Sequence, residues 1–302
     1  MSTLELETRD AMAVLVPADV PDMRRSLLER RNLVDVLLTA LVWGMAILAA
    51  VPLISVLYML ITEGGARLSW EALTSLPPAG FMPGGGFGNA IVGTLVMVAI
   101  ASLIAIPLGV LGGIYLGAFA PSGRLSHAVR FVAKVMTGFP SILAGVFVFG
   151  VLVKMMGTYS AIAGGVSLAV LMLPTVLLTA EQAIRMVPQR MKDAAYGMGC
   201  NPTQTVLQVV LPTAMPGIMT GVMLAIAGAA GESAPLLFTA LFSSYWLEGL
   251  AEPTASLSIL IYNFSGMPFQ NQVELAWSAS LVLVLIVLVF NILSRLFGSR
   301  RV

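Results

Sequence analysis

The sequence predicts an all-α membrane protein with six transmembrane helices. Of its 302 residues, 58% are hydrophobic and only 10% are charged, whereas about a quarter of the residues in an ordinary soluble domain are charged. The mean hydropathy of the chain is +0.94, and long apolar stretches alternate with polar segments. This composition indicates an integral membrane protein.

The apolar stretches divide the chain into a polar cytoplasmic tail, residues 1–32, and a transmembrane domain, residues 33–302. The first stretch is free of charge from residue 36 to residue 60, and as a helix it would cross a hydrocarbon core of about 30 Å with some tilt. The tail lacks a continuous apolar core, so we expect no cleavable signal peptide. The six predicted spans cover approximately residues 36–60, 90–119, 135–153, 160–180, 214–241 and 275–293.

The basic residues favour a topology with both termini in the cytoplasm. Short cytoplasmic segments of membrane proteins are enriched in Lys and Arg. With six spans, 14 of the 16 basic residues fall on the cytoplasmic side, and only Arg67 and Lys154 fall outside. The same topology places residues 191–213, a polar segment between the fourth and fifth spans, in the cytoplasm.

Two long loops lie on the outer side in this topology. The first, residues 62–88, contains the sequence PPAGFMPGGGFG, which cannot form a regular helix. The second, residues 242–274, includes an apolar patch at 257–264. We interpret this patch as a short interfacial or re-entrant helix, with Tyr262 and Phe264 at the level of the lipid headgroups.

The sequence contains no constellation of residues for catalysis. The loop G-x-x-x-x-G-K-[ST] is absent, so the chain is not expected to bind and hydrolyse ATP by that mechanism. The single histidine, His127, is interpreted as a solvated residue of a cytoplasmic turn. The single cysteine, Cys200, cannot form a disulfide within the chain. We therefore expect no enzymatic activity, no metal site, no cofactor bound by this chain and no nucleic-acid partner.

Glu232 is a carboxylate inside the predicted fifth span. An isolated charge in a transmembrane helix costs roughly 2.5 to 3.5 kcal/mol on insertion scales, so it is expected to face a cavity or a partner. Gly228, Gly231 and Pro235 flank it and favour a bent helix with free backbone groups that line a path. Ser233 belongs to the same candidate path. Alternatively, Glu232 lies near the outer interface and is solvated, or it caps a broken helix end.

The third predicted span has a weak point at Pro140. Proline lacks an N–H and clashes with the carbonyl four residues earlier, which would free backbone groups near Met136. Thr137 and Ser141 add hydroxyls, and such groups can hold an oxyanion briefly without a buried positive charge. The alternative is a proline kink that only shapes the helix bundle.

A charged pair closes the predicted fourth span. Glu181 and Arg185 are four residues apart and therefore share one helical face. At an exposed helix end such a pair contributes about 0.2–0.5 kcal/mol, so we assign it a structural role.

The segment Met191–Gly217, MKDAAYGMGCNPTQTVLQVVLPTAMPG, is polar, rich in glycine and set between apolar runs. The helical turn Asp193-Ala194-Ala195 is expected to end at Gly197 and Gly199, and Asn201-Pro202 signals a turn before a new helix. Small side chains would let another surface approach closely. The segment therefore has the properties of a docking site.

This segment resembles the cytoplasmic loop of ABC importer permeases, which reads E-A-A, three residues, G, nine residues, I-x-L-P. Asp193-Ala194-Ala195, Gly199 and Val209-Val210-Leu211-Pro212 match it at the full spacing, with Asp193 and Val209 as conservative variants. The resemblance implies the fold of type I ABC importer permeases. It also implies that the loop forms a coupling helix in a cleft of an ATP-hydrolysing subunit.

Further segments resemble the phosphate-specific branch of these importers, and GESAPLLFTAL at 231–241 is most similar to its A-type permease. The others are GFGNAIVGTL at 86–95, PLGVLGGIYL at 107–116 and GFPSILAG at 138–145. The resemblance implies a bacterial inner membrane complex with a homologous C-type permease and two copies of an ATP-binding subunit that uses ATP and Mg²⁺. An extracytoplasmic phosphate-binding protein would dock on the outer loops. This chain would form half of a phosphate pathway that works by alternating access.

The chain departs from this family at two positions. Many relatives carry an arginine three residues before the Gly-Glu of the fifth span, where this chain has Gly228, and Leu178 occupies a second position at which relatives can place an arginine. We therefore expect Glu232 to accept a hydrogen bond from a protonated phosphate, a bond that sulfate cannot offer at neutral pH. The partner permease would supply the positive charge.

Three other functions fit parts of the sequence. A permease of the same superfamily for another oxyanion, such as molybdate or sulfate, would share the docking segment. An ATP-independent channel or carrier leaves that segment unexplained. A structural membrane scaffold would not require a carboxylate at Glu232.

Overall fold

A computed structural model of the chain describes residues 30–299. Within this range the chain is helical, with turns and loops and no strand, as predicted. The helices are α2 (Arg30–Ala66), α3 (Trp70–Thr74), α4 (Gly88–Ile114), α5 (Arg124–Thr137), α6 (Ser141–Val148), α7 (Lys154–Met156), α8 (Ala161–Arg185), α9 (Gln189–Gly197), α10 (Pro202–Thr205), α11 (Leu211–Gly231), α12 (Ala234–Leu237), α13 (Leu257–Ser265) and α14 (Gln270–Ser299), with π-helical segments η1 (Tyr115–Phe119), η2 (Phe149–Val153) and η3 (Val206–Val210).

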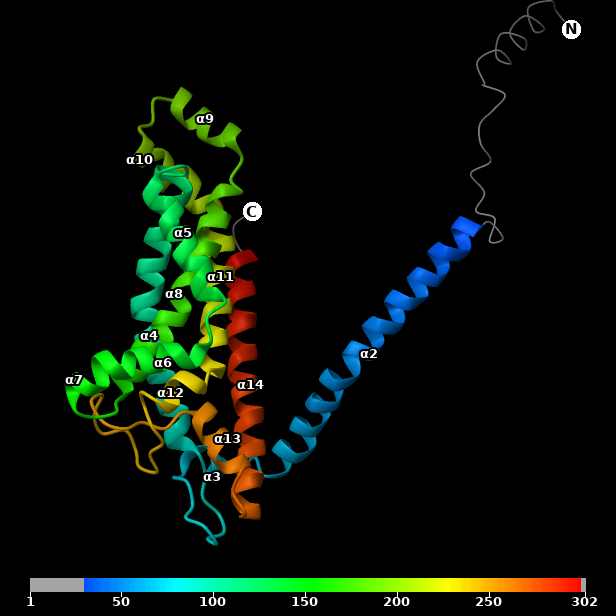
Figure 1. Ribbon diagram of the computed structural model, residues 1–302, viewed down its shortest axis with the longest axis vertical. Helices are drawn as coiled ribbons and strands as arrows, with labels where there is room; N and C mark the ends of the chain where they lie inside the picture. The colour runs from blue at the N-terminus through cyan, green and yellow to red at the C-terminus, as the bar shows by residue number, and fades with distance from the viewer. Residues whose placement is uncertain (1–29, 300–302) are drawn as a thin grey trace, which may run out of the picture. The chain divides into compact units, whose positions relative to one another are not determined.

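The contacts divide the chain into two units, Met1–Leu57 and Tyr58–Val302. In the first unit, the part that the structure describes is the N-terminal portion of α2. The second unit holds the end of α2 and the helices from α3 to α14 (Figure 1). Most of the predicted cytoplasmic tail and both chain ends lie outside the described residues.

Five helical stretches among the described residues are long and apolar enough to cross a membrane: Asn32–Ala66, Gly88–Phe119, Ala161–Arg185, Pro202–Gly231 and Gln270–Leu293. A sixth crossing results if α5 and the helix from Ser141 to Met156, which meet at 106°, are counted as one broken span. The all-α membrane fold is therefore confirmed, with one of the predicted spans bent through more than a right angle.

The bent span differs from its predicted bounds, residues 135–153. Helix α5 begins at Arg124, so the basic residues of the predicted cytoplasmic turn, including His127, lie in a helix. This helix ends at Thr137 because Gly138 weakens it and Pro140 disfavours helical conformation at the residue before it. The predicted fifth span, residues 214–241, also differs, since helix α11 already ends at Gly231.

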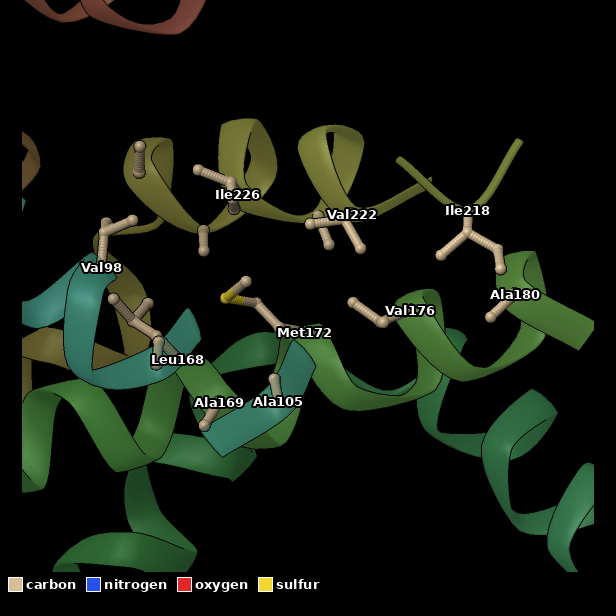
Figure 2. Close-up of a cluster of buried hydrophobic side chains, with 14 of the residues drawn as sticks. Val98, Ala105, Leu168, Ala169, Met172, Val176, Ala180, Ile218, Val222 and Ile226 are labelled. Carbon is tan, nitrogen blue, oxygen red and sulfur yellow. The ribbon is translucent and has the colours of Figure 1, made fainter. Parts of the chain in front are cut away.

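Helix α8 is central to the packing of the second unit. Helices α4 and α11 both pack against it, and Figure 2 shows Met172 of α8 facing Val222 and Ile226 of α11. Helix α4 comes close because a Cβ atom on Gly113 would lie only 2.6 Å from the Cβ of Ala180. This close packing holds the three helices at the centre of the bundle in fixed positions.

Helix α13 is the helix predicted in the second outer loop, and it is more buried than predicted. It packs against α14, and its residues Leu257, Ile259 and Leu260 are fully buried. Phe264, expected at the lipid headgroups, is also buried, whereas Tyr262 is exposed. The run has apolar side chains around most of the helix, which is typical of a buried helix.

The C-terminal end of α8 is held by a buried carboxylate. Glu181 is 5% exposed, and its Oε1 lies 2.6 Å from Nε of Arg130 and 2.9 Å from Nε of Arg185. Arg130 also donates a 2.9 Å hydrogen bond from Nη2 to the carbonyl of Leu116 in η1. The predicted pair of Glu181 and Arg185 is therefore present, but Glu181 is buried rather than exposed, because Arg130 on α5 also binds the carboxylate.

We expect Glu181→Ala to lower the thermal unfolding midpoint of the purified protein in micelles. Removing one member of a buried ion pair costs about 3–5 kcal/mol because the other charge is left unpaired. The side chain of Arg130 is 15% exposed, so we expect a loss of stability at or below the lower end of this range. Arg130→Ala combined with Glu181→Ala should cost clearly less than the sum of the single changes. Additive losses would contradict a direct interaction. Arg185→Ala, at a half-exposed side chain, is the control with the smaller effect.

Candidate functional site

The first candidate site is the coupling segment, which we define as residues 189–212. It comprises α9, α10, η3 and the first residues of α11. Figure 1 shows α9 at one end of the bundle, beyond the ends of the long helices. It follows the C-terminal end of α8 after the three residues Met186–Pro188. A partner can therefore reach α9 without entering the bundle.

Helix α9 ends through backbone geometry that depends on Gly199. The Met198 N–H donates to the carbonyl of Ala194 at 3.0 Å, and the Cys200 N–H donates to the carbonyl of Ala195 at 3.1 Å. Gly199 has a φ of +87° and open space around the position of a Cβ atom. The position needs glycine for its left-handed backbone rather than for lack of room.

Helix α10 starts with a reciprocal cap. The side-chain oxygen of Asn201 accepts from the Gln204 N–H at 2.8 Å, and the Gln204 side chain accepts from the Asn201 N–H at 2.9 Å. Pro202 occupies the first helical turn, where it loses no hydrogen bond. Helix α10 continues through η3 into α11 without a break, and Pro212 lies in the first turn of α11. The coupling segment is thus continuous with a helix that crosses the membrane.

The predicted coupling residues differ in exposure. Asp193, Ala194, Gly199 and Pro212 are exposed, whereas Ala195 is 1% exposed and supports the fold of the segment. The apolar side chains of Met191, Tyr196 and Met198 are also exposed on and after α9. The surface that a partner can contact therefore combines small and apolar side chains around Ala194 with the exposed polar side chains of Arg190 and Asp193.

Glu232 lies at the other end of α11, at a break in the chain. It has extended backbone angles, φ −75° and ψ 124°, and follows the last helical residue, Gly231. Ser233 then forms the N-cap of α12. The Glu232 carbonyl, which no longer has a helical partner, accepts a 2.9 Å hydrogen bond from Oγ of Ser258 on α13. Glu232 is thus the cap of a broken helix, one of the alternatives that the sequence left open.

The half-buried Glu232 side chain also lines a hollow of about 300 Å³ between α8 and α11. Thr175 contributes the other polar side chain, and Gly228 leaves space on the α11 side. The remaining lining residues are Leu171, Met172, Leu224, Ala225 and Ala229. A carboxylate and a hydroxyl in an apolar hollow can bind a ligand that donates hydrogen bonds, and no basic side chain of this chain is among the lining residues.

Thr137, Pro140 and Ser141 lie at the bend between α5 and α6 and do not line the hollow with Glu232. The Thr137 hydroxyl donates within its own helix, to the carbonyl of Lys134 at 2.7 Å. The Met136 carbonyl, expected to be free, accepts from the Phe139 N–H at 3.2 Å. That expectation was wrong because Pro140 precedes a new helix instead of interrupting a continuous one.

Sequence reasoning missed two polar residues at the Glu232 site. Thr175 is one of several hydroxyl residues in the apolar run of α8, and Ser258 lies in the apolar patch of the second outer loop, so neither gave a local signal. In the described part of the chain, no group of three or more His, Cys, Asp or Glu side chains could hold a metal ion. The site that can be assembled from this chain consists of Glu232, Thr175 and the backbone around them.

Comparison with known proteins places this geometry in a family. Residues 109–302 match the family model of the binding-protein-dependent transport system inner membrane component. The phosphate transport system permease protein PstA of Yersinia pestis is 36% identical over 249 residues, which are 82% of this chain and 84% of the relative. The probable phosphate transport system permease protein PstA of Methanocaldococcus jannaschii is 36% identical over 260 residues, 85% of this chain and 91% of the relative.

A solved structure shows the same fold. A chain of a bacterial alginate ABC transporter, in complex with an alginate pentasaccharide-bound periplasmic protein, matches with a TM-score of 0.64 and 16% identity over 91% of this chain and 98% of that one. The apolar helices and the relatives make the chain a multi-pass inner membrane protein. The chain belongs to the family of binding-protein-dependent transport system inner membrane components, in the branch of the PstA phosphate transport permeases.

Proposed function

We propose that the chain is the membrane-spanning permease subunit of an ATP-driven importer of inorganic phosphate, and that it forms half of the translocation pathway by alternating access. The relatives named for phosphate transport support the substrate. The main support for the proposed mechanism is the continuous helical stretch Pro202–Gly231. It is about 45 Å long at 1.5 Å per residue. It begins in the coupling segment and ends at Glu232, so a displacement of one end moves the other.

The proposed complex contains this chain, a homologous C-type permease, two copies of an ATP-binding subunit and an extracytoplasmic phosphate-binding protein. ATP and Mg²⁺ act in the ATP-binding subunits, and this chain binds no cofactor. The exposed coupling segment would dock on one ATP-binding subunit through Asp193, Ala194 and Gly199. Both termini lie in the cytoplasm of a bacterium in this arrangement, as the distribution of basic residues favours.

Glu232 gives the proposed site a preference among anions. At neutral pH phosphate still carries a proton and can donate a hydrogen bond to a carboxylate, whereas sulfate cannot. A fully deprotonated anion would meet only repulsion from Glu232, because the lining residues of this chain include no basic side chain. The partner permease would supply the positive charge. The alternative substrate is sulfate or molybdate, and an uptake experiment distinguishes these anions from phosphate.

The function is tested by uptake of labelled phosphate into liposomes that contain the purified complex and internal ATP, with external phosphate-binding protein. We expect uptake that depends on ATP and persists in excess unlabelled sulfate. Glu232→Gln should lower phosphate uptake or the discrimination against sulfate by about tenfold, the value of one charge-assisted hydrogen bond. The matched control is Asp35→Asn, the corresponding loss of a carboxylate at an exposed residue of α2, outside the outer loops. Unchanged uptake and selectivity in Glu232→Gln would disprove the role of this carboxylate.

Ala194→Trp should abolish co-purification of the ATP-binding subunit, because a bulky side chain prevents close approach at the exposed face of α9. Ala195 is a poorer test, since its side chain is buried and a larger residue would distort the segment itself. Ala251→Trp, at an exposed alanine of the outer loop, is the control that should leave the complex intact. If Ala194→Trp still co-purifies with the ATPase at wild-type yield, an ATP-independent carrier gains support.

A further inference from the structure

Helices α5, α6 and α8 enclose an apolar groove that the proposed phosphate path does not use. One hollow of about 500 Å³ lies between α5, α6 and α8, and a second of about 250 Å³ lies between α5 and α8. Val132 and Met136 line both hollows, so the two adjoin, and we call them together the α5 groove. Neither Glu232 nor Thr175 is among its lining residues.

The lining of the α5 groove is apolar throughout and largely open to the surroundings. Every lining residue has an apolar side chain. Phe131 on α5 is 69% exposed and Phe147 on α6 is 62% exposed. An exposed apolar hollow of this size marks a site for a membrane component or another apolar ligand.

The size of the lining side chains favours a flexible acyl chain over a helix of another subunit. Helix–helix interfaces in membranes are enriched in small residues, which let the backbones approach closely. Helices α4 and α8 follow this rule, because a Cβ atom on Gly109 would lie only 2.7 Å from Cγ1 of Val176. The exposed walls of the α5 groove consist mainly of Phe, Leu and Val side chains. They keep a second backbone at a distance, whereas an acyl chain can follow their irregular surface.

Basic side chains accompany the groove along α5. This helix contains two arginines, a histidine and a lysine, and no Asp or Glu. Arg124 and Lys134 are exposed, and they lie seven residues before and three residues after Phe131. At 3.6 residues per turn both therefore share the helical face of Phe131. The same face thus presents an apolar surface and positive charge.

The positive charge lies at the end of the groove where a lipid headgroup would be. The start of α5 adjoins the end of α8, since Nη2 of Arg185 donates to the carbonyl of Pro121 at 3.3 Å, and α8 leads from there to α9. Helical side chains tilt toward the N-terminus of their helix, so the Lys134 stem runs past Phe131 toward this end. Arg130 and Arg185 share the single carboxylate of Glu181, which leaves the region positive.

We propose that the α5 groove is a binding site for an anionic phospholipid. An acyl chain fills the groove and packs against both arms of the 106° bend. Lys134 binds the headgroup phosphate, and Arg124 adds positive potential farther along the same face. In the proposed topology this end of α5 is cytoplasmic, and basic pockets between transmembrane helices on that side are typical sites for anionic headgroups. The site does not depend on which anion the complex transports.

Fluorescence quenching in vesicles of defined composition tests the proposal. The complex with Phe131→Trp is reconstituted into mixtures of phosphatidylglycerol and phosphatidylcholine in which one lipid or the other has brominated acyl chains, and the wild-type signal is subtracted. We expect a preference for phosphatidylglycerol of about fivefold or more, and Lys134→Gln in the same background should lower it about fivefold. Equal quenching by the two lipids would overturn the proposal. Absence of quenching by both would also overturn it, because protein would then cover the groove.

Two control variants identify the source of the preference. Lys154→Gln makes the same change at an exposed lysine of α7 outside the lining and should leave the preference unchanged. Leu103→Trp places the probe on the exposed side of α4, where the two lipids should bind within about twofold of each other. An equal preference at both probe positions would contradict a selective groove. A complex that prefers the anionic lipid but imports no phosphate would support this site and disprove the proposed function.

Discussion

In a hydrocarbon environment every backbone polar group needs a partner within the protein, and this constraint decides where the helices of the chain can stop. Helix α11 stops at Gly231, and Ser258 of α13 donates a hydrogen bond to the carbonyl of Glu232, the next residue. The Leu257 N–H at the start of α13 is in turn bound by the hydroxyl of Thr94 on α4, at 2.8 Å. The opening beside Glu232 thus depends on a buried helix that satisfies the broken backbone.

The coupling segment and the Glu232 site are connected by two long helices. Helix α8 enters the coupling segment from one side, and the stretch from Pro202 to Gly231 leaves it on the other. The buried ion pair of Glu181 with Arg130 ties the end of α8 to α5. Close packing of α8 with α4 and α11 leaves little room for independent movement. The arrangement suits a subunit that moves as a block when the end that carries α9 is displaced.

The two ends of the second unit differ in chemistry. At the end that carries α9, small and apolar side chains around Ala194 are exposed. In the loop between α3 and α4, at the opposite end, the exposed ring of Phe81 meets the ring of Phe269 edge-on. The hollow that Glu232 lines lies between α8 and α11.

The sequence by itself determined the features that depend on neighbouring residues. Apolar stretches indicated the membrane helices. The orientation predicted from Lys and Arg, and the coupling role predicted from the spacing between Asp193 and Pro212, stay predictions. The turn at Gly199 and the cap at Asn201 follow from local backbone chemistry, and the structure contains both. Glu232 was recognised because a carboxylate in an apolar run is costly.

Only the tertiary structure decided the features that depend on residues far apart in the chain. Arg130 lies 51 residues from Glu181, so no local pattern could show that the carboxylate is buried between two arginines. The loop between α3 and α4 is bound by Asn271, which donates to the carbonyl of Met82 from 189 residues away. The end of α11 and the break at Pro140 likewise required knowledge of what packs beside them. Periodicity and composition report how a residue relates to its neighbours in sequence, whereas burial and backbone strain are set by contacts that form only when the helices assemble.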